Sequence, residues 1–285
     1  MELEFVKLSP LGNTTVFLRG DVEPAMRAAL LCEAMDYDHL AAEQAGFLVL
    51  PHAESSLLRI EMAGGEFCGN ATLAAAALAV AEGARAPFFI ECSGAAVPLQ
   101  AEARALGAGR WLARAEMPQA HDVRRLSLDG VASEALRPIS ATNAVAVKAT
   151  CVLLPGIAHL VIEATDLSTA SYEALLSRFM HEAEADAYGI VPFARLAQER
   201  FRIRPYVAVP RAKSRVFERA CGSGSLALAL ALGGEAEGRR LAVEQPGGTL
   251  FVESGERFCL EGEVLLSCRG TVEVAAEIEK VFIRE

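Results

Sequence analysis

Two cysteines in this sequence stand where a thiol could do acid–base chemistry. Cys68 is followed by Gly-Asn and Cys221 by Gly-Ser, and in both places a long stretch rich in alanine and leucine comes next. Roughly half of the chain separates the two cysteines. The same short motif therefore occurs twice, which predicts two equivalent halves that each present one thiol.

Each cysteine is predicted to lie at the N-terminus of a helix. A glycine after the cysteine lets the backbone take unusual angles and leaves its N–H open to a ligand. The free N–H groups of a first turn and the helix dipole favour an anion there, and such a setting can lower a thiol pKa from ~8.5 to roughly 3.5–7.5. We therefore expect a thiolate at neutral pH beside a site for a carboxylate. A single cysteine in apolar surroundings is more often an inert core residue, so the duplication is what favours chemistry.

Two thiols that face each other across a cleft suit inversion at a carbon acid. One thiolate removes the proton and the opposite thiol delivers another, while the helix N-termini bind an α-carboxylate and stabilise the developing charge. No motif marks a Schiff-base lysine, a phosphate-binding loop or a metal-ligand cluster. We therefore expect no cofactor and no metal.

The composition limits the classes of partner. The 285 residues carry a net charge of −10, with 52% hydrophobic and 22% charged residues. A negative net charge does not favour binding to nucleic acid or to an anionic membrane. No apolar run is long and uncharged enough to span a bilayer. The N-terminal residues lack the basic flank and apolar block of a signal peptide. We expect a cytoplasmic protein with a small-molecule partner.

The cysteine count also agrees with a cytoplasmic protein. Seven cysteines form an odd number without CxxC pairs, which argues against a disulfide framework and against a structural zinc site. Reduced thiols are expected.

The rest of the chain must position the two thiols, and most of it has the pattern of short strands. In the first half, strands are predicted at residues 4–8, 14–18, 46–50, 57–62, 88–92, 97–100 and 111–117, with a helix from 24 to about 45. In the second half, strands are predicted at 144–148, 160–163, 202–204, 206–209, 249–252, 263–267 and 271–274, with a helix at 171–184.

Both cysteine helices are apolar on every face, so each must be enclosed. The polar segment 121–129 is the expected connection between the halves. The predicted fold class is α+β, with two pseudo-symmetric β-rich domains that each wrap around a central helix.

Essentially the whole chain resembles the cofactor-independent diaminopimelate epimerase superfamily, through the ordered strings Gly12-Asn13, Glu43-Gln44, Glu66-Phe67-Cys68-Gly69-Asn70, Glu218, Ala220-Cys221-Gly222-Ser223-Gly224 and Gln245-Pro246-Gly247-Gly248. Residues 43–47, 66–72, 117–121 and 245–248 more closely resemble the histidine racemases of staphylopine-type metallophore pathways. The resemblance implies catalysis by Cys68 and Cys221 without pyridoxal phosphate.

The resemblance also implies contacts with an amino acid substrate. The side chains expected to contact it are those of Asn13, Glu43, Asn70 and Glu218, and the backbone N–H groups expected at its carboxylate are those of Gly69, Gly222 and Ser223. It implies an N-terminal domain of residues 1–122 completed by a C-terminal strand at 272–285, and a C-terminal domain of residues 123–271. A homodimer is a candidate assembly.

Departures from the superfamily pattern bear on the substrate. True diaminopimelate epimerases carry Gly-Asn-Pro-His where this chain has Gly156-Ile157-Ala158-His159, and an asparagine where Arg204-Pro205-Tyr206 stands. The segment before the second cysteine is also shortened, so we do not transfer a substrate role to Arg219. These positions grip the second amino acid head of diaminopimelate, so we expect L-histidine as the substrate.

Several alternatives stay open from the sequence. The enzyme could racemise another amino acid, namely a basic amino acid, a diamino acid or diaminopimelate itself. A different class is a non-catalytic amino-acid-binding or redox-sensing protein, in which Cys68 and Cys221 close a reversible disulfide. His121 and His159 lie in strings similar to the family and are candidates for the pocket, whereas His39, His52 and His181 lack metal-ligand spacing.

Overall fold

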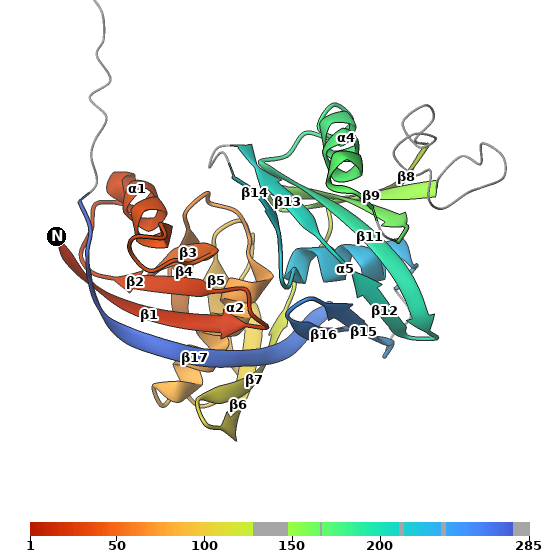
Figure 1. Cartoon of the computed structure of the whole chain (residues 1–285). Coiled ribbons are helices and arrows are strands. Elements are labelled where there is room, and N and C mark those ends of the chain that lie inside the picture. The colour runs from red at the N-terminus through yellow and green to blue at the C-terminus, as the bar shows by residue number, and fades with distance from the viewer. Residues whose placement is uncertain (128–147, 166, 211–213, 235–237, 276–285) are drawn as a thin grey trace, which may run out of the picture.

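The structure, a computed structural model, describes residues 1–127, 148–165, 167–210, 214–234 and 238–275. Figure 1 shows two groups of strands side by side, with one long strand that runs beneath the first group and reaches the second. Within the described residues there are four helices, of which two are amphipathic covers and two are buried. The fold is therefore a sheet-rich member of the α+β class.

The first group of strands encloses a helix. Its elements are β1 (Glu2–Pro10), β2 (Thr15–Arg19), α1 (Pro24–Met35), β3 (Gln44–Val49), β4 (Ser56–Met62), α2 (Gly69–Ala81), β5 (Phe88–Cys92), β6 (Leu99–Gly107) and β7 (Arg110–Glu116), completed by the last strand, β17 (Cys259–Glu273). Strands β1 to β7 pair in sequence order, β7 pairs with β17, and β17 pairs back with β1. The strands close into a ring, and α2 contacts every one of them.

The sequence of α2 explains why it can fill a ring of strands. Alanine and leucine favour the helical state, and their small or apolar side chains leave no polar group to be solvated on any face. Residues 69–79 are all buried. The helix ends at Ala81, and Gly83 follows with a φ of 100°, a left-handed conformation that glycine adopts without strain. The expected helix at the first cysteine is confirmed.

The second group of strands packs on the other cysteine helix. Its elements are β8 (Asp122–Ser127), β9 (Lys148–Leu154), β10 (Ile157–Glu163), α4 (Thr169–Phe179), β11 (Ala187–Ala197), β12 (Arg200–Ile203), β13 (Tyr206–Val209), β14 (Ser214–Phe217), α5 (Gly222–Ala231), β15 (Arg240–Gln245) and β16 (Gly248–Glu253). Helix α5 contacts β9, β10, β11 and β16 on its sides and α2 at its end. Helix α4 covers the outer face of these strands through Tyr172, Leu175 and Phe179.

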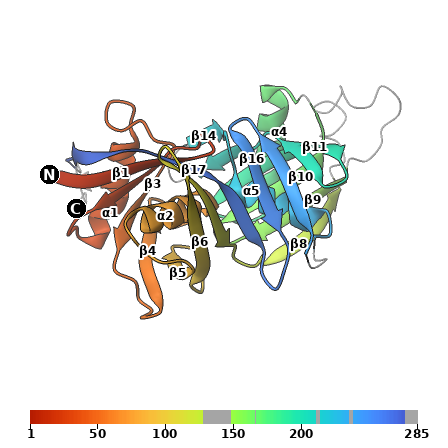
Figure 2. The same ribbon diagram turned by 90° about the horizontal axis from the view of Figure 1, so that it is seen from below.

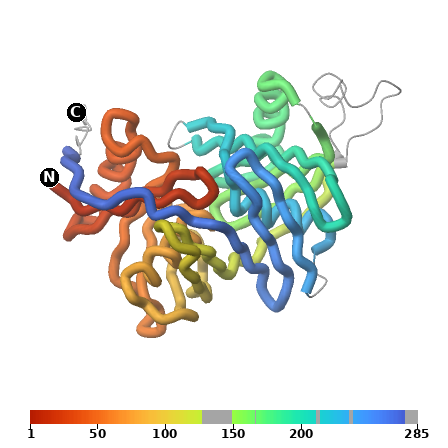
Figure 3. Tube along the Cα trace, turned by 60° about the horizontal axis from the view of Figure 1, so that its bottom comes forward, coloured from red at the N-terminus to blue at the C-terminus, as the bar shows by residue number. Residues whose placement is uncertain are grey.

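Strand β17 joins the two groups. Residues 259–261 pair with β16, residues 259–265 pair with β7, and residues 264–273 pair with β1. Figures 2 and 3 show this strand crossing from one group to the other beside β1. One continuous apolar core contains residues of both cysteine helices together with Leu260 and Val264 of β17. The two cysteine helices are therefore fixed relative to each other by shared packing.

Several sequence expectations differ from the structure. The helix predicted for residues 24–45 ends at Met35, because Asp36 takes an extended conformation with ψ at 152°. The segment 121–129, expected as a connection, forms β8 up to Ser127 and pairs with β9. The strands expected at 263–267 and 271–274 are one continuous strand, β17, and the helix expected at 171–184 ends at Phe179. The strands β11, β14 and β15 were not predicted. The strand expected at 144–147 lies outside the described residues.

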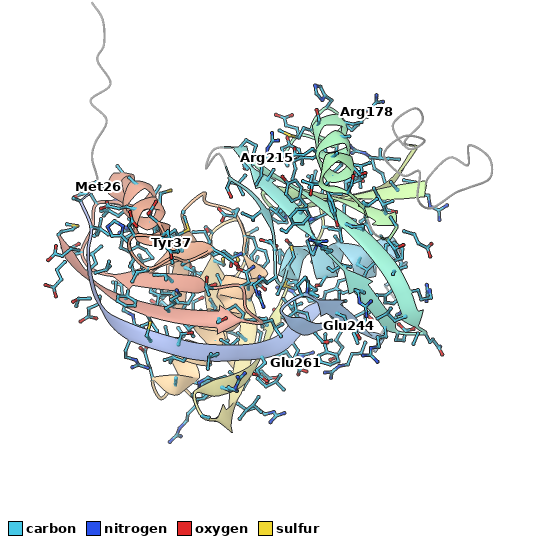
Figure 4. All side chains as sticks on the ribbon, viewed as in Figure 1. Met26, Tyr37, Arg178, Arg215, Glu244 and Glu261 are labelled. Carbon is cyan, nitrogen blue, oxygen red and sulfur yellow. The ribbon has the colours of Figure 1, made fainter. Side chains whose placement is uncertain are left out.

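The surface is charged and the cores are apolar. Arg178 and Arg215 are exposed on the outside of the second group, and Glu244 pairs with Arg202 at 3.1 Å (Figure 4). Among the described residues no helix has the length and hydropathy that a membrane crossing requires.

Candidate active site

The two cysteines cap their helices in the same way. Cys68 has φ −129° and ψ 109°, and its Sγ accepts a hydrogen bond from the N–H of Ala71 at 3.4 Å. Cys221 has φ −124° and ψ 108°, and its Sγ accepts from the N–H of Gly224 at 3.3 Å. In each copy the hydroxyl four residues later donates to the carbonyl of the cysteine. The duplicated sequence therefore folds into duplicated local geometry.

The two helix N-termini meet in the core. A Cβ added to Gly222 would lie 3.4 Å from the Cα of Gly69 and 2.8 Å from the Cδ2 of Leu260. A Cβ added to Gly69 would lie 3.0 Å from the Cε of Met117. A side chain at either position would press on the end of Leu260 or Met117, so glycine at both positions leaves room for the close approach. The approach brings the free N–H groups of two helix starts to one place.

A cavity of about 500 Å³ opens at this place. Its walls include both thiols, and most of the predicted contacts are there as well: Glu43, Cys68, Gly69, Asn70, Glu218, Cys221, Gly222 and Ser223. A larger hollow of about 950 Å³ lies elsewhere, over Arg19, Arg27 and Glu82. The charges there pair with neighbouring residues, so we place the site at the smaller cavity.

Asn13 is the predicted contact that does not line the cavity. Its side chain is fully buried, and its Nδ2 donates to the carbonyl of Ala220 at 2.7 Å. The Nδ2 of Asn70 donates to the same carbonyl at 2.8 Å. Two amides from the first group therefore hold the residue directly before Cys221.

Burial changes the acidity of both thiols. It raises the pKa of Cys68 and of Cys221 well above the usual value of 9.0, and the N–H bonds from Ala71 and Gly224 oppose the change without outweighing it. The expectation of thiolates stabilised by the helix starts is wrong for this structure, because the cost of desolvating a charged sulfur exceeds the gain from one N–H group. At neutral pH both groups are thiols.

The two thiols have different neighbours. The thiol of Cys68 donates to the Oε1 of Gln44 at 3.3 Å, and an amide carbonyl cannot take its proton. Cys221 stands beside the carboxyl of Glu218 and 3.5 Å from the Oγ of Ser223. Burial raises the pKa of Glu218 to about 7, with a hydrogen bond from Cys221 lowering it and the charge of Glu43 raising it. Glu218 therefore exchanges a proton near neutral pH.

The structure adds Gln44 and Gln245, which the sequence analysis did not assign to the site, and it places His159, a pocket candidate from the sequence, next to Ser223. Gln44 contacts Cys68 as described, and Gln245 accepts from the backbone N–H of Cys221 at 2.7 Å. The Nε2 of His159 lies 2.9 Å from the Oγ of Ser223. Burial lowers the pKa of His159 to about 3, so its ring is neutral. Gln44 and Gln245 both stood in strings that resemble the family, and that was the only signal for them.

The described cysteines are all free thiols, Cys68 and Cys221 included. Within the same residues no group of three or more histidine, cysteine or acidic side chains could hold a metal ion.

The fold and the site define a class of protein. The chain superposes on a probable proline racemase from Agrobacterium radiobacter with a TM-score of 0.69 and 11% identity, covering 98% of this chain and 94% of that one. It superposes on a hydroxyproline epimerase from Agrobacterium vitis with a TM-score of 0.68 and 10% identity, covering 97% and 92%. At these identities the likeness shows a shared fold, that of proline racemase-like proteins.

The sequence comparisons identify the family. Residues 2–280 match the model of the histidine racemase CntK N-terminal domain, and the chain belongs to this family. A histidine racemase of Fusobacterium nucleatum subsp. nucleatum is 28% identical over 280 residues, covering 95% of this chain and 97% of the relative. A histidine racemase of Staphylococcus aureus is 24% identical over 286 residues, covering 94% and 96%. The protein is therefore an isomerase of the amino acid racemase class.

Proposed function

We propose that the protein interconverts L- and D-histidine by a two-base mechanism in which Cys68 and Cys221 act on opposite faces of the α-carbon. The observation that carries the proposal is the pair of cysteine-capped helix starts at one cavity. Membership of the histidine racemase family supports the choice of substrate. The reading as a binding or redox-sensing protein is set aside, because the family is one of racemases.

The substrate carboxylate is proposed to lie between the helix starts. There the backbone N–H groups of Gly69, Asn70, Gly222 and Ser223 can donate to its oxygens, and both helix dipoles favour its charge. These donors also face the charge that develops when the α-proton leaves. Glu43 and Glu218 line the same cavity, and we assign them to the α-ammonium group and its surroundings. We assign Asn13 the task of holding the carbonyl of Ala220.

The proton transfers can then be written with a balance of charge. Cys221 passes its proton to ionised Glu218, so that a thiol and a carboxylate become a thiolate and a carboxylic acid without a change in the net charge of a buried site. The thiolate of Cys221 removes the α-proton of one enantiomer, and the thiol of Cys68 delivers its own proton to the opposite face. This turnover leaves Cys68 as the thiolate, which is the state that removes the α-proton of the other enantiomer. Exchange with solvent, in which Glu218 loses a proton and Cys68 gains one, restores the starting state.

The finer assignments are proposals of the same kind. We propose that no cofactor or metal takes part, that the D-histidine serves an opine-type metallophore, and that the fold is that of diaminopimelate epimerases, with domains of residues 1–122 plus 272–285 and 123–271. A cytoplasmic location and a homodimer remain predictions. Racemisation of another basic amino acid, a diamino acid or diaminopimelate is the alternative, since the cavity wall carries three carboxyl groups.

Incubation in heavy water with enantiopure substrates tests the proposal. We expect each enantiomer of histidine to give the other with deuterium at the α-carbon, in the presence of EDTA and without pyridoxal phosphate. Faster turnover of diaminopimelate than of histidine would exclude the histidine assignment and leave the racemase class. Dependence on an added metal or cofactor would exclude the cofactor-free mechanism.

A further inference from the structure

The wall of the cavity contains side chains with buried hydrogen-bond acceptors. Three of its lining residues hold a buried side-chain oxygen without a partner in the described structure: Oε2 of Glu66, Oδ1 of Asn70 and Oε2 of Glu218. Asn70 is only 2% exposed. Buried polar atoms normally have partners because an unmet one costs free energy. All three atoms are closed to solvent in this structure, so the charges of the carboxyl groups in the wall decide which ligand the cavity favours.

Two of these acceptors belong to the reacting centre. Asn70 is in the first turn of α2, and Glu218 stands beside Cys221. We have assigned Glu218, together with Glu43, to the α-ammonium group and its surroundings. Glu66 is the carboxyl group of the wall that this assignment leaves over.

Glu66 is held rigidly at the edge of the two groups of strands. The turn at Gly156 of the second group approaches it so closely that a Cβ there would lie 3.3 Å from the Cα of Glu66. On its other side, a Cβ added to Gly94 would clash with the backbone of Phe67. Burial raises the pKa of Glu66, and backbone N–H groups of Glu66 and Gly64 lower it. The charge of Asp186, which directly precedes β11, also raises it, so acidic groups from both halves influence this point.

The carboxyl group of Glu43, which also lies in the cavity wall, already has a cation near it. Burial raises the pKa of Glu43, but the charge of Arg219 and an N–H group of Thr14 lower it. Lysine and arginine are absent from the described residues that line the cavity. Much of the remaining wall is apolar, including Val207, Val209 and Val216. A substrate side chain in this cavity therefore meets a hydrophobic surface and one carboxyl group without a cation.

We propose that Glu66 is the specificity-determining residue of the racemase, and that its carboxylate accepts a hydrogen bond from a positively charged substrate side chain, either an imidazolium or a terminal ammonium. The inference rests on the proposed function, because it takes the cavity as the binding site of an amino acid. It gives the charge preference of the site to Glu66, whereas the sequence analysis named Glu43 as a contact of the substrate. A charge-assisted bond at a desolvated site is stronger than a neutral one, and a cation there also relieves the repulsion between Glu66 and Asp186.

Two amino acids of nearly equal size separate charge from shape. L-2,4-Diaminobutyrate ends in an ammonium group where L-norvaline ends in a methyl group. Calorimetric titration of the full-length protein with each gives a preference ratio that needs no turnover. We expect the wild type to bind diaminobutyrate at least about tenfold more tightly, and Glu66→Gln to reduce the ratio about tenfold. Glu66→Asp, which keeps the charge, should retain most of the preference.

The matched control is Glu54→Gln, which removes the same charge from an exposed position outside the cavity. It should leave the ratio unchanged. An unchanged ratio in Glu66→Gln, or an equal loss of affinity for both probes, would overturn the inference. If the ratio shifts as expected but heavy-water incubation shows no exchange at histidine, the charge preference stands and the histidine assignment falls.

Discussion

Replacing Glu218 by glutamine should make the protein more stable at alkaline pH while it damages catalysis. The carboxyl of Glu218 has a buried oxygen without a hydrogen-bond partner, and burial raises its pKa from 4.5 to about 7. Its charged form is therefore disfavoured in the folded protein relative to the unfolded chain. Glutamine has nearly the same shape and carries no charge at any pH.

The size of the effect follows from linkage. Between pH 4.5 and 7 the unfolded chain has lost the proton of Glu218 while the folded protein still binds it, so stability falls as the pH rises. The contribution is fully present below pH 4.5 and is lost as the pH passes 7. Each pKa unit corresponds to 1.36 kcal/mol, so the wild type should lose about 3 kcal/mol from this group alone. The variant should not lose it.

Urea unfolding of both proteins at pH 4, 6, 7 and 8.5 measures the difference. We expect the free energies of unfolding to differ least at pH 4, and the variant to gain about 3 kcal/mol on the wild type by pH 8.5. Racemisation at pH 8 should fall at least about tenfold, since an amide cannot accept the proton of Cys221. A stability difference that does not change with pH would refute the assignment of a raised pKa to Glu218.

Three further predictions concern the thiols and their support. Cys68→Ser and Cys221→Ser should each abolish racemisation, because a hydroxyl is too weak an acid to replace the thiol; rates within tenfold of the wild type, a barrier change under ~1.4 kcal/mol, would exclude the two-thiol mechanism. His159 is neutral and buried with a pKa of about 3 instead of 6.5, so stability should be full above pH 6.5 and fall by about 4–5 kcal/mol toward pH 3. His159→Gln should remove this acid-dependent component in urea titrations. Gly189→Ala would clash with the ring of His159 and should cost about 1–3 kcal/mol, whereas Gly255→Ala, with its nearest contact at 3.5 Å, should change the melting temperature little.

The parts of the fold that the sequence predicts are those fixed by local interactions. A cysteine before a glycine, followed by alanine and leucine, specifies both the cap and the helix, and α2 and α5 begin where expected. A helix that is apolar on every face is predicted to be enclosed by other elements, and α2 is enclosed by the strands of the first group. Most of the first-group strands also appear near their predicted residues, because alternation and turn residues act within a few positions.

Features that depend on distant contacts escape such reasoning. The end of α1 at Met35 is an example, because helical spacing continues through Leu40 while the backbone turns at Asp36. Leu40 and Ala42 pack against the same apolar cluster as α1 without being helical. The direction of the pKa shift of the two thiols is another example. A helix start predicts a lower pKa, but the extent of burial depends on how closely the two groups of strands approach.

The duplicated motif hides a difference that only the tertiary structure provides. The backbone angles at Cys68 and Cys221 agree within a few degrees, and both thiols accept an N–H bond from the third residue after the cysteine. Their partners come from elsewhere in the chain and are unlike: an amide from Gln44 at the first thiol, a carboxyl from Glu218 at the second. Racemisation needs one thiol charged and one protonated at the start of each turnover. A symmetric backbone with one ionisable neighbour satisfies that need, because the proton has an acceptor at one thiol and none at the other.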